Sequence, residues 1–321
     1  MLEILDGGVS TTVQDLGRFG QYHTGMPPAG AMDQYAHKLG NSLVGNDEDA
    51  ATLEMTYGGA DVTFHEDAVI ALTGSAMPAT LDGEDVPMNQ AVAVEAGQEL
   101  ETQFATDGAR TYLAVAGGID VPRVMESKST YTLVGIGGHE GRTLEEGDEL
   151  PIADGNGPEM GGKSIPDEYV RDYADNEPIR VVVGLCDYRL TDESREALCD
   201  AEWTVTPEAD RVGYRLEGPK LEFVEREQPF GAGTDLSNVV DLGYPVGSIQ
   251  LPQKPIVLMR DAVTGGGYAT VGTVISSDRD LLSQRRTHES VYFESVTVEE
   301  ALEAREATQA DLAAVHDALS Q

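Results

Sequence analysis

Three glycine-rich loops of this 321-residue chain carry the polar side chains that could do chemistry. The first loop, residues 11–34, places four glycines and two consecutive prolines around Gln14, Asp15 and Arg18. Because glycine permits backbone angles closed to other residues and proline fixes φ, the segment is typical of a shaped loop. Asp15 can act as a base or hold a cation, and Arg18 can bind a carboxylate or phosphate through two hydrogen bonds. The same residues also fit a structural Asp15–Arg18 pair that only fastens the loop, so both interpretations stay open.

The second loop, residues 126–150, combines hydroxyl groups with a histidine and an arginine. Ser129 and Thr130 offer hydroxyls, and a Gly-Gly pair leads into His139 and Arg142. His139 is the best placed of the six histidines for proton transfer, because it lies in a glycine-rich loop rather than in a strand. The alternative interpretation is a surface histidine without a role in chemistry.

The third loop lies within residues 247–284 and follows an apolar strand. That strand, residues 256–259, ends in Arg260-Asp261, and Thr264 with three glycines comes next. Polar residues at a strand end, followed by a flexible glycine turn, form a common active-site arrangement. The alternative is a glycine-rich hairpin with a surface aspartate.

One further motif invites a nucleotide-binding interpretation. Residues 157–164 read G-P-E-M-G-G-K-S, which satisfies the P-loop pattern. A functional P-loop needs a buried strand before it and a helix that opens at the lysine, so that backbone amides bind phosphate. Pro151 and Asp154 precede this match without a convincing apolar strand, and Pro166 with an acidic stretch follows it. We therefore interpret the match as a coincidence within a linker.

Other motif classes are absent from the sequence. It contains no H-E-x-x-H or C-x-x-C spacing, no G-x-S-x-G elbow, and only two cysteines, Cys186 and Cys199. The cysteines are too few for a disulfide framework and do not have the spacing of a zinc site. No metal site and no serine hydrolase of the elbow type are predicted.

The net charge excludes whole classes of partner. Fifty-seven acidic residues against 21 basic ones give −36, and only five of the basic residues are lysines. Such self-repulsion destabilises a compact state in dilute buffer, whereas salt at about 1 M shortens the Debye length to about 3 Å. The composition therefore predicts a protein adapted to molar salt, as in halophilic archaea; the alternative is a merely acidic protein. Nucleic acids and anionic membranes are disfavoured as partners, because both call for a basic surface.

The hydrophobic pattern predicts a mainly β chain without a membrane segment. The strand-like runs are DVTF, AVIALTG, AVAVEAG, RTYLAVAGG, IRVVVG, EWTVT, PIVLM and SVYFESV. An Asp-Gly pair within residues 81–84 predicts a tight hairpin turn, and apolar residues at helical spacing predict a helix over residues 32–44. The sequence has no apolar run of 18 residues and does not begin with a signal peptide, so a soluble, cytoplasmic protein is expected.

A break rich in glycine and acidic residues divides the chain. The expected organisation is an N-terminal β domain over residues 1–152, a linker over 153–178, a C-terminal β domain over 179–297 and a C-terminal helix over 298–321.

Taken together, the loops resemble one family over residues 2–296. The matching segments are TTVQDLGRFG, GMPPAGAMDQYAHKLGNSLVGN, ATLEMTYGGADVTF, SKSTY with GGHEGR, RVGYRLEGP, and GSIQLPQKPIVLMRDAVTGGGY with DLLSQ. The chain resembles the biotin-dependent carboxyltransferase-like family of allophanate hydrolase subunit 2 (KipA-like), whose members include the C subunit of bacterial and archaeal 5-oxoprolinase. Ala29 replaces the usual small polar residue, TGGGYA from Thr264 replaces TTGGYP, and RTHES replaces a Pro-Gly-Asp. These departures concern the fine shape of a pocket more than the fold.

The resemblance implies a fold, partners and a reaction. The fold is mainly β, with two cyclophilin-like β-barrel domains, a few short helices and a C-terminal helix. The partners are a KipI-like B subunit and a lactam-utilisation-like A subunit. The reaction is the ATP-dependent opening of 5-oxo-L-proline to L-glutamate, an amide (lactam) hydrolysis. One alternative is carboxyl transfer from biotin to urea or a related amide, with biotin arriving on another protein. Another is a non-catalytic antagonist that binds a KipI-like partner.

The resemblance and the three loops together give the candidate site residues. Lactam opening needs groups that move protons and groups that bind anions. Asp15, His139 and Asp261 are the candidates for proton transfer. The candidates for substrate binding are Gln14, Arg18, Gly30, Asp33, Ser129, Thr130, Arg142, Gln250, Thr264, Gly265, Gly266 and Tyr268.

Overall fold

The computed structural model describes residues 1–155 and 160–320. The chain divides into two compact units. The first comprises Met1–Arg18, Ala29–Ala174 and Gln309–Gln321, and the second comprises Phe19–Pro28 and Asp175–Thr308. Much of the predicted linker packs into the first unit, because its apolar residues Ile165 and Tyr173 are buried there. No helix in the described ranges combines the length and apolar character needed to cross a membrane.

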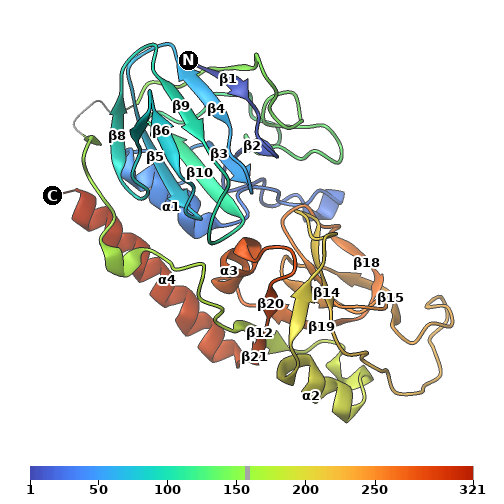
Figure 1. The fold of residues 1–321 in the computed structure, drawn as a ribbon. Coiled ribbons are helices and arrows are strands. Elements are labelled where there is room, and N and C mark those ends of the chain that lie inside the picture. The colour runs from blue at the N-terminus through green and yellow to red at the C-terminus, as the bar shows by residue number, and fades with distance from the viewer. Residues whose placement is uncertain (156–159, 321) are drawn as a thin grey trace. The chain divides into compact units, whose positions relative to one another are not determined.

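Two β-sheets form the first unit. Its strands are β1 (Leu2–Asp6), β2 (Thr11–Gln14), β3 (Thr52–Thr56), β4 (Asp61–Phe64), β5 (Ala68–Gly74), β6 (Ala79–Leu81), β7 (Glu84–Asp85), β8 (Ala91–Val94), β9 (Glu99–Thr102), β10 (Arg110–Val115) and β11 (Glu149–Leu150). One sheet has the order β11-β1-β4-β9-β6-β7 and the other β2-β3-β10-β5-β8 (Figure 1). Apolar side chains such as Phe64, Leu72 and Leu113 form one buried cluster drawn from both sheets. Strand β4 shows why the prediction works: its burial alternates residue by residue, as expected for a strand with one buried face.

Helix α1 (Gln34–Leu43) covers the five-stranded sheet, close to the predicted span of 32–44. Its apolar residues, including Leu39 and Leu43, pack on Val69 and Ala114 of strands β5 and β10. The helix begins at Asp33, whose side chain accepts a hydrogen bond from the backbone N–H of Ala36. Such a cap satisfies one of the backbone donors that a helix start leaves open.

The predicted hairpin turn is present. Strands β6 and β7 pair through Leu81 and Glu84, so Asp82 and Gly83 alone make the turn. Both turn residues have positive φ, 51° and 85°, as a two-residue turn of this hand requires.

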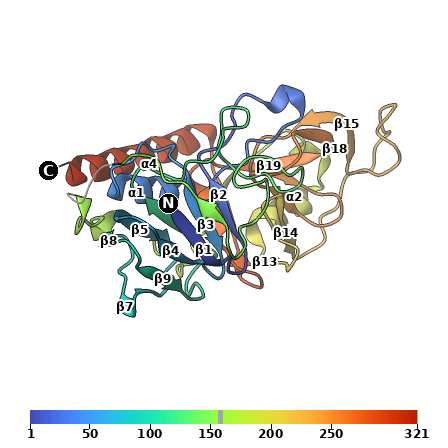
Figure 2. The ribbon, with the colours of Figure 1, turned by 90° about the horizontal axis from the view of Figure 1, so that it is seen from above.

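The second unit is a sheet that closes on itself. Its strands are β12 (Ile179–Val183), β13 (Trp203–Val205), β14 (Gly213–Glu217), β15 (Asn238–Gly243), β16 (Ser248–Gln250), β17 (Ile256–Leu258), β18 (Gly265–Tyr268), β19 (Thr270–Val274), β20 (Ser290–Val291) and β21 (Phe293–Ser295). Eight of them form one sheet with the order β20-β13-β14-β17-β16-β19-β12-β21, and β15 pairs with β18 in a separate ribbon (Figure 2). Only Tyr292 separates β20 from β21, although they lie at opposite ends of the sheet order. The sheet must therefore curl until its two edges meet, which makes it a nearly closed barrel.

Two helices complete the second unit, and a third runs through the end of the chain. Helices α2 (Asp192–Asp200) and α3 (Asp278–Gln284) belong to the second unit, as do the short 3₁₀ turns η1 (Tyr22–Thr24) and η4 (Asp187–Arg189). A further 3₁₀ turn, η3 (Asp167–Tyr169), lies in the first unit. The predicted C-terminal helix is α4 (Val298–Leu319), and its buried residues Val315 and Leu319 join the cluster under α1.

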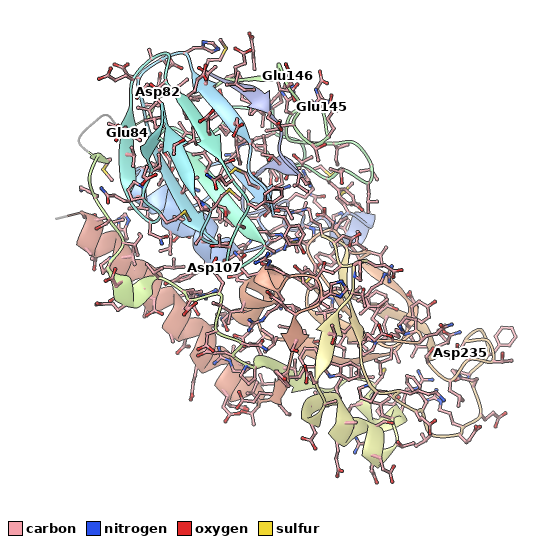
Figure 3. All side chains as sticks on the ribbon, in the orientation of Figure 1. Asp82, Glu84, Asp107, Glu145, Glu146 and Asp235 are labelled. Carbon is pink, nitrogen blue, oxygen red and sulfur yellow. The ribbon has the colours of Figure 1, made fainter. Side chains whose placement is uncertain are left out.

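Exposed carboxylates occur on both units. The exposed carboxylates include Asp82 and Glu84 at the β6–β7 hairpin, Glu145 and Glu146 in the second loop, and Asp235; Figure 3 labels them together with the half-buried Asp107. Asp235 belongs to the second unit and the others to the first, so exposed negative charge is not confined to one unit.

The lysine of the P-loop-like match has a structural partner. Gly157, Pro158 and Glu159 lie outside the described residues, but Lys163 donates a hydrogen bond from Nζ to the backbone carbonyl of Leu319, at the end of α4. A cation at a helix C-terminus pairs with carbonyls that have no partner within the helix.

We therefore expect Lys163→Ala to leave turnover unchanged and to lower stability by about 1 kcal/mol or less, as for a single helix-end interaction. Turnover by the assembled enzyme and urea unfolding of the chain measure the two effects. A thousandfold loss of activity would instead support a phosphate-binding role for Lys163.

Candidate functional site

Asp15 lies at the centre of a buried network in the first unit. Its carboxylate accepts hydrogen bonds from the backbone N–H groups of Gly17 (2.8 Å) and Lys128 (2.5 Å) and from the hydroxyl of Ser127 (2.7 Å). The Ser129 hydroxyl is a fourth donor and also accepts from the Asp15 backbone N–H at 3.1 Å. With only 3% of the residue exposed, Asp15 joins the first loop to the second.

Arg18 is enclosed by the same two loops. It is 1% exposed, and its Nη2 donates to the backbone carbonyl of Ser129. Gly137 and Gly138, both with positive φ, pack so closely on Ser129 and Thr130 that a Cβ at either glycine would overlap them. Glycine is therefore needed at both positions, because the backbone there lies against Ser129, Thr130 and the Arg18 guanidinium.

Gln14 and Thr130 hold strand β2 against the second loop. The Gln14 amide donates to the Thr12 hydroxyl (3.0 Å) and to the Thr130 carbonyl (3.2 Å), while the Thr130 hydroxyl donates to the Val13 carbonyl (2.9 Å). The structure thus brings five predicted site residues into one network: Gln14, Asp15, Arg18, Ser129 and Thr130.

His139 and Arg142 share one acidic partner. Arg142 binds Asp148 with two hydrogen bonds, of 2.7 and 2.8 Å, and His139 Nε2 lies 3.2 Å from the same carboxylate. Chiefly through its hydrogen bonds to Arg142, the pKa of Asp148 falls to about 2, so this carboxylate is ionised at neutral pH. Both side chains are therefore engaged by a carboxylate of their own loop, and both stay partly exposed, Arg142 at 32% and His139 at 22%.

Gly30 and Asp33 have structural roles in the first loop. Gly30 has a φ of 88°, and a Cβ there would lie 2.6 Å from the carbonyl oxygen of Leu16. Asp33 caps α1 and also accepts a hydrogen bond of 2.7 Å from the Tyr173 hydroxyl. Both residues shape the first loop rather than present a free group.

The third predicted loop belongs to the second unit, where Asp261 has its own partner. Its carboxylate receives Arg211 Nε at 2.9 Å and Arg211 Nη2 at 3.2 Å, and the residue is 2% exposed. This paired geometry is typical of a buried ion pair that fixes a loop.

The glycine turn after Asp261 forms strand β18 of the separate ribbon. Tyr244 organises it: its backbone N–H donates to the Thr264 carbonyl (2.9 Å), and its hydroxyl donates to the Tyr268 carbonyl (2.9 Å). A Cβ at Gly266 would come within 3.0 Å of the Tyr244 ring. Burial raises the pKa of the Tyr244 hydroxyl, and a hydrogen bond with the buried Gln250 side chain opposes this rise.

A pocket of about 680 Å³ lies in the second unit beside this turn. Thr264 lines it from the predicted set, and Tyr22, Tyr244, Arg260 and Arg279 line it as well. Sequence reasoning missed these four as site residues. The available signal was the pair of arginines retained in a chain with so few basic residues, one at each side of the glycine turn.

The described part of the chain contains no evident metal-binding site. No group of three or more histidine, cysteine, aspartate or glutamate side chains is arranged there to hold an ion.

Known proteins share this sequence and architecture. Residues 24–295 match the carboxyltransferase domain, subdomain A and B, family model. The chain is 39% identical over 316 residues to the 5-oxoprolinase C subunit of Escherichia coli (strain K12), with 96% of each chain covered. It is 32% identical to the urea amidolyase of Saccharomyces cerevisiae over 95% of this chain but only 17% of the relative. The crystal structure of Kluyveromyces lactis urea carboxylase superposes with a TM-score of 0.91 at 30% identity, over 97% of this chain and 29% of that one.

The expected fold class is confirmed: the chain is mainly β with a few helices, its second unit holds a nearly closed barrel, and the structural match covers 97% of the chain. The similarity to these proteins, in sequence and in structure, extends over most of the chain and is not limited to one motif. The chain therefore belongs to the carboxyltransferase domain family, subdomain A and B.

Proposed function

We propose that this chain is the C subunit of an ATP-dependent 5-oxoprolinase, an enzyme complex that opens 5-oxo-L-proline to L-glutamate. The observation that carries the proposal is the match to the Escherichia coli 5-oxoprolinase C subunit, which is 39% identical over 96% of both chains. In the urea amidolyase, by contrast, the matching part is 17% of a much longer chain.

The reaction sets the chemistry that the complex must supply. The lactam oxygen attacks the γ-phosphorus of ATP and ADP leaves, which makes the ring carbon electrophilic. Water then adds to that carbon, the ring C–N bond breaks as the nitrogen takes a proton, and an acyl phosphate remains. A second water releases phosphate and leaves glutamate. Proton transfer and anion binding are the tasks open to this subunit.

Within this proposal, His139 is the residue we assign to proton transfer. Its imidazole is partly exposed and lies 3.2 Å from Asp148, a carboxylate that can orient the ring. Asp15 and Asp261 are saturated by donors of the chain itself, and we assign them to holding the first and third loops in place. We also propose that the complex hydrolyses ATP and that it contains a KipI-like B subunit and a lactam-utilisation-like A subunit. Its proposed location is the cytoplasm.

The test is to assemble the complex. Co-purification of this chain with its KipI-like and lactam-utilisation-like partners in molar KCl should give ATP hydrolysis that depends on 5-oxo-L-proline, with one glutamate released per ATP. Omission of this chain should abolish glutamate release. The absence of both activities in the full complex would overturn the proposal.

A second candidate function is carboxyl transfer from biotin to urea or a related amide. The match to the Kluyveromyces lactis urea carboxylase structure favours it. None of the five lysines has the Ala-Met-Lys-Met setting of a biotin carrier, so biotin would arrive on another protein. Carboxylation of urea with a biotinylated carrier, and no turnover of 5-oxoproline, would establish this function instead.

A further inference from the structure

The pocket of the second unit carries a guanidinium without a carboxylate partner. Arg279 makes one hydrogen bond within the described residues, a long one of 3.4 Å from Nε to the Val274 carbonyl. No carboxylate of the described chain lies within ion-pair distance of it. In a protein with 57 acidic residues, an arginine that faces a pocket and is left without one is unusual.

The backbone makes room for this arginine. Gly247 has a φ of 91°, and a Cβ there would lie 3.0 Å from Arg279 Nε and 2.8 Å from the Val274 carbonyl oxygen. A side chain at position 247 would therefore displace the guanidinium from the pocket wall.

A second arginine increases the positive charge of the pocket. Arg260 is 6% exposed, and one of its guanidinium nitrogens lies 3.8 Å from the carboxylate of Asp280. Burial, and then the neighbouring Arg260, lower the pKa of Arg279 to about 10. Both guanidiniums remain charged at neutral pH, so an incoming anion relieves their repulsion.

Aromatic side chains line the same pocket. Phe19 is 60% exposed and Tyr22 is 39% exposed, and both come from the segment Phe19–Pro28 that belongs to this unit. Their exposed surfaces offer apolar contact to a small ring. The pocket thus joins one unpaired cation to an apolar wall.

We propose that this pocket binds the carboxylate of a small, ring-bearing acid, with Arg279 as the anchoring residue. The planar guanidinium fork matches a carboxylate with two hydrogen bonds, and the ring packs on Tyr22 and Phe19. A carboxylate fits better than a phosphate, because Arg260 is already shared with Asp280 and no lysine lines the pocket. The identification of the acid as 5-oxo-L-proline rests on the proposed function; urea has no carboxylate to place here.

The test compares ligands with and without the carboxylate. The probes are 5-oxo-L-proline, its carboxamide and cyclopentanecarboxylate, which keeps the acid and a five-membered ring but has no lactam. The variants are Arg279→Gln and Arg279→Lys. The control is Arg215→Gln, which removes a half-exposed surface arginine paired with Glu208 at 3.3 Å.

In the assembled complex, Arg279→Gln should raise KM for 5-oxo-L-proline about 10- to 100-fold, the effect of losing a charge-assisted hydrogen-bonded pair. The preference for the acid over the carboxamide should fall by a similar factor, and Arg279→Lys should restore part of it. Arg215→Gln should change neither quantity. A merely structural role of Arg279 would lower turnover of both ligands without changing the ratio between them.

The possible outcomes separate this inference from the proposed function. Activity with 5-oxo-L-proline and an unchanged acid-to-amide ratio in Arg279→Gln would overturn the inference and leave the function standing. An inactive complex whose chain still binds cyclopentanecarboxylate in an Arg279-dependent manner, measured by calorimetry, would overturn the function and support the carboxylate pocket. A complex that shows neither activity nor Arg279-dependent binding would overturn both the inference and the proposed function.

Discussion

Asp15→Ala should lower the free energy of unfolding by about 3–5 kcal/mol, among the largest effects of a single substitution in the first unit. The change removes the acceptor for two serine hydroxyls and two backbone N–H groups, all of them fixed around the buried carboxylate. Each donor left unsatisfied in the interior costs about 1–3 kcal/mol. Urea unfolding in molar KCl, followed by circular dichroism, measures the loss.

Asp120→Ala is the matched control for this substitution. Asp120 also bonds to Lys128, at 2.9 Å, but 57% of its side chain is exposed. An exposed ion pair of this kind contributes about 1 kcal/mol or less. If Asp15→Ala proved as mild as Asp120→Ala, the Asp15 network would not be what holds the two loops together.

Arg211→Leu should destabilise the second unit by a comparable amount, about 3–5 kcal/mol. The substitution leaves the Asp261 carboxylate buried at 2% exposure without the guanidinium that binds it through both oxygens. An uncompensated buried charge costs far more than the pair contributes when intact. Thermal unfolding of the full chain, monitored at several salt concentrations, reports the change.

A double variant separates charge compensation from packing. Arg211→Leu/Asp261→Leu removes both charges and should recover most of the stability lost in the single variant, because an apolar pair can replace a buried ion pair. Additive losses in the double variant would mean that the two side chains act independently. The ion-pair explanation would then be wrong.

Local patterns predicted much of the fold. Strands β4 and β5 begin and end where their runs of strand-forming residues do, and Asp82-Gly83 makes the turn that its two residue types favour. The run SVYFESV, in contrast, was expected as one strand and forms two, β20 and β21. Closure of the barrel divides this run, and closure depends on strands far away in the sequence.

The candidate site was predicted less completely, for a related reason. Residue types and glycine spacing marked the first two loops, but the contact between Asp15 and Ser129 joins positions 114 residues apart. Whether Asp261 or its neighbour Arg260 faces the pocket depends on the twist of one strand end, which no local pattern encodes. That Arg279 forms no ion pair within the described residues, although Asp280 follows it directly, also depends on how the chain folds.

The segment Phe19–Pro28 has a consequence for dissecting the molecule. Although it lies near the start of the chain, it belongs to the second unit and supplies Phe19 and Tyr22 to the pocket there. A fragment that begins at Asp175 would keep both pocket arginines and Tyr244 but lose Phe19 and Tyr22. Neither unit is encoded by one continuous stretch of sequence, so cutting the gene at the central break would not yield two self-sufficient modules, and recombination between relatives would have to exchange the chain as a whole.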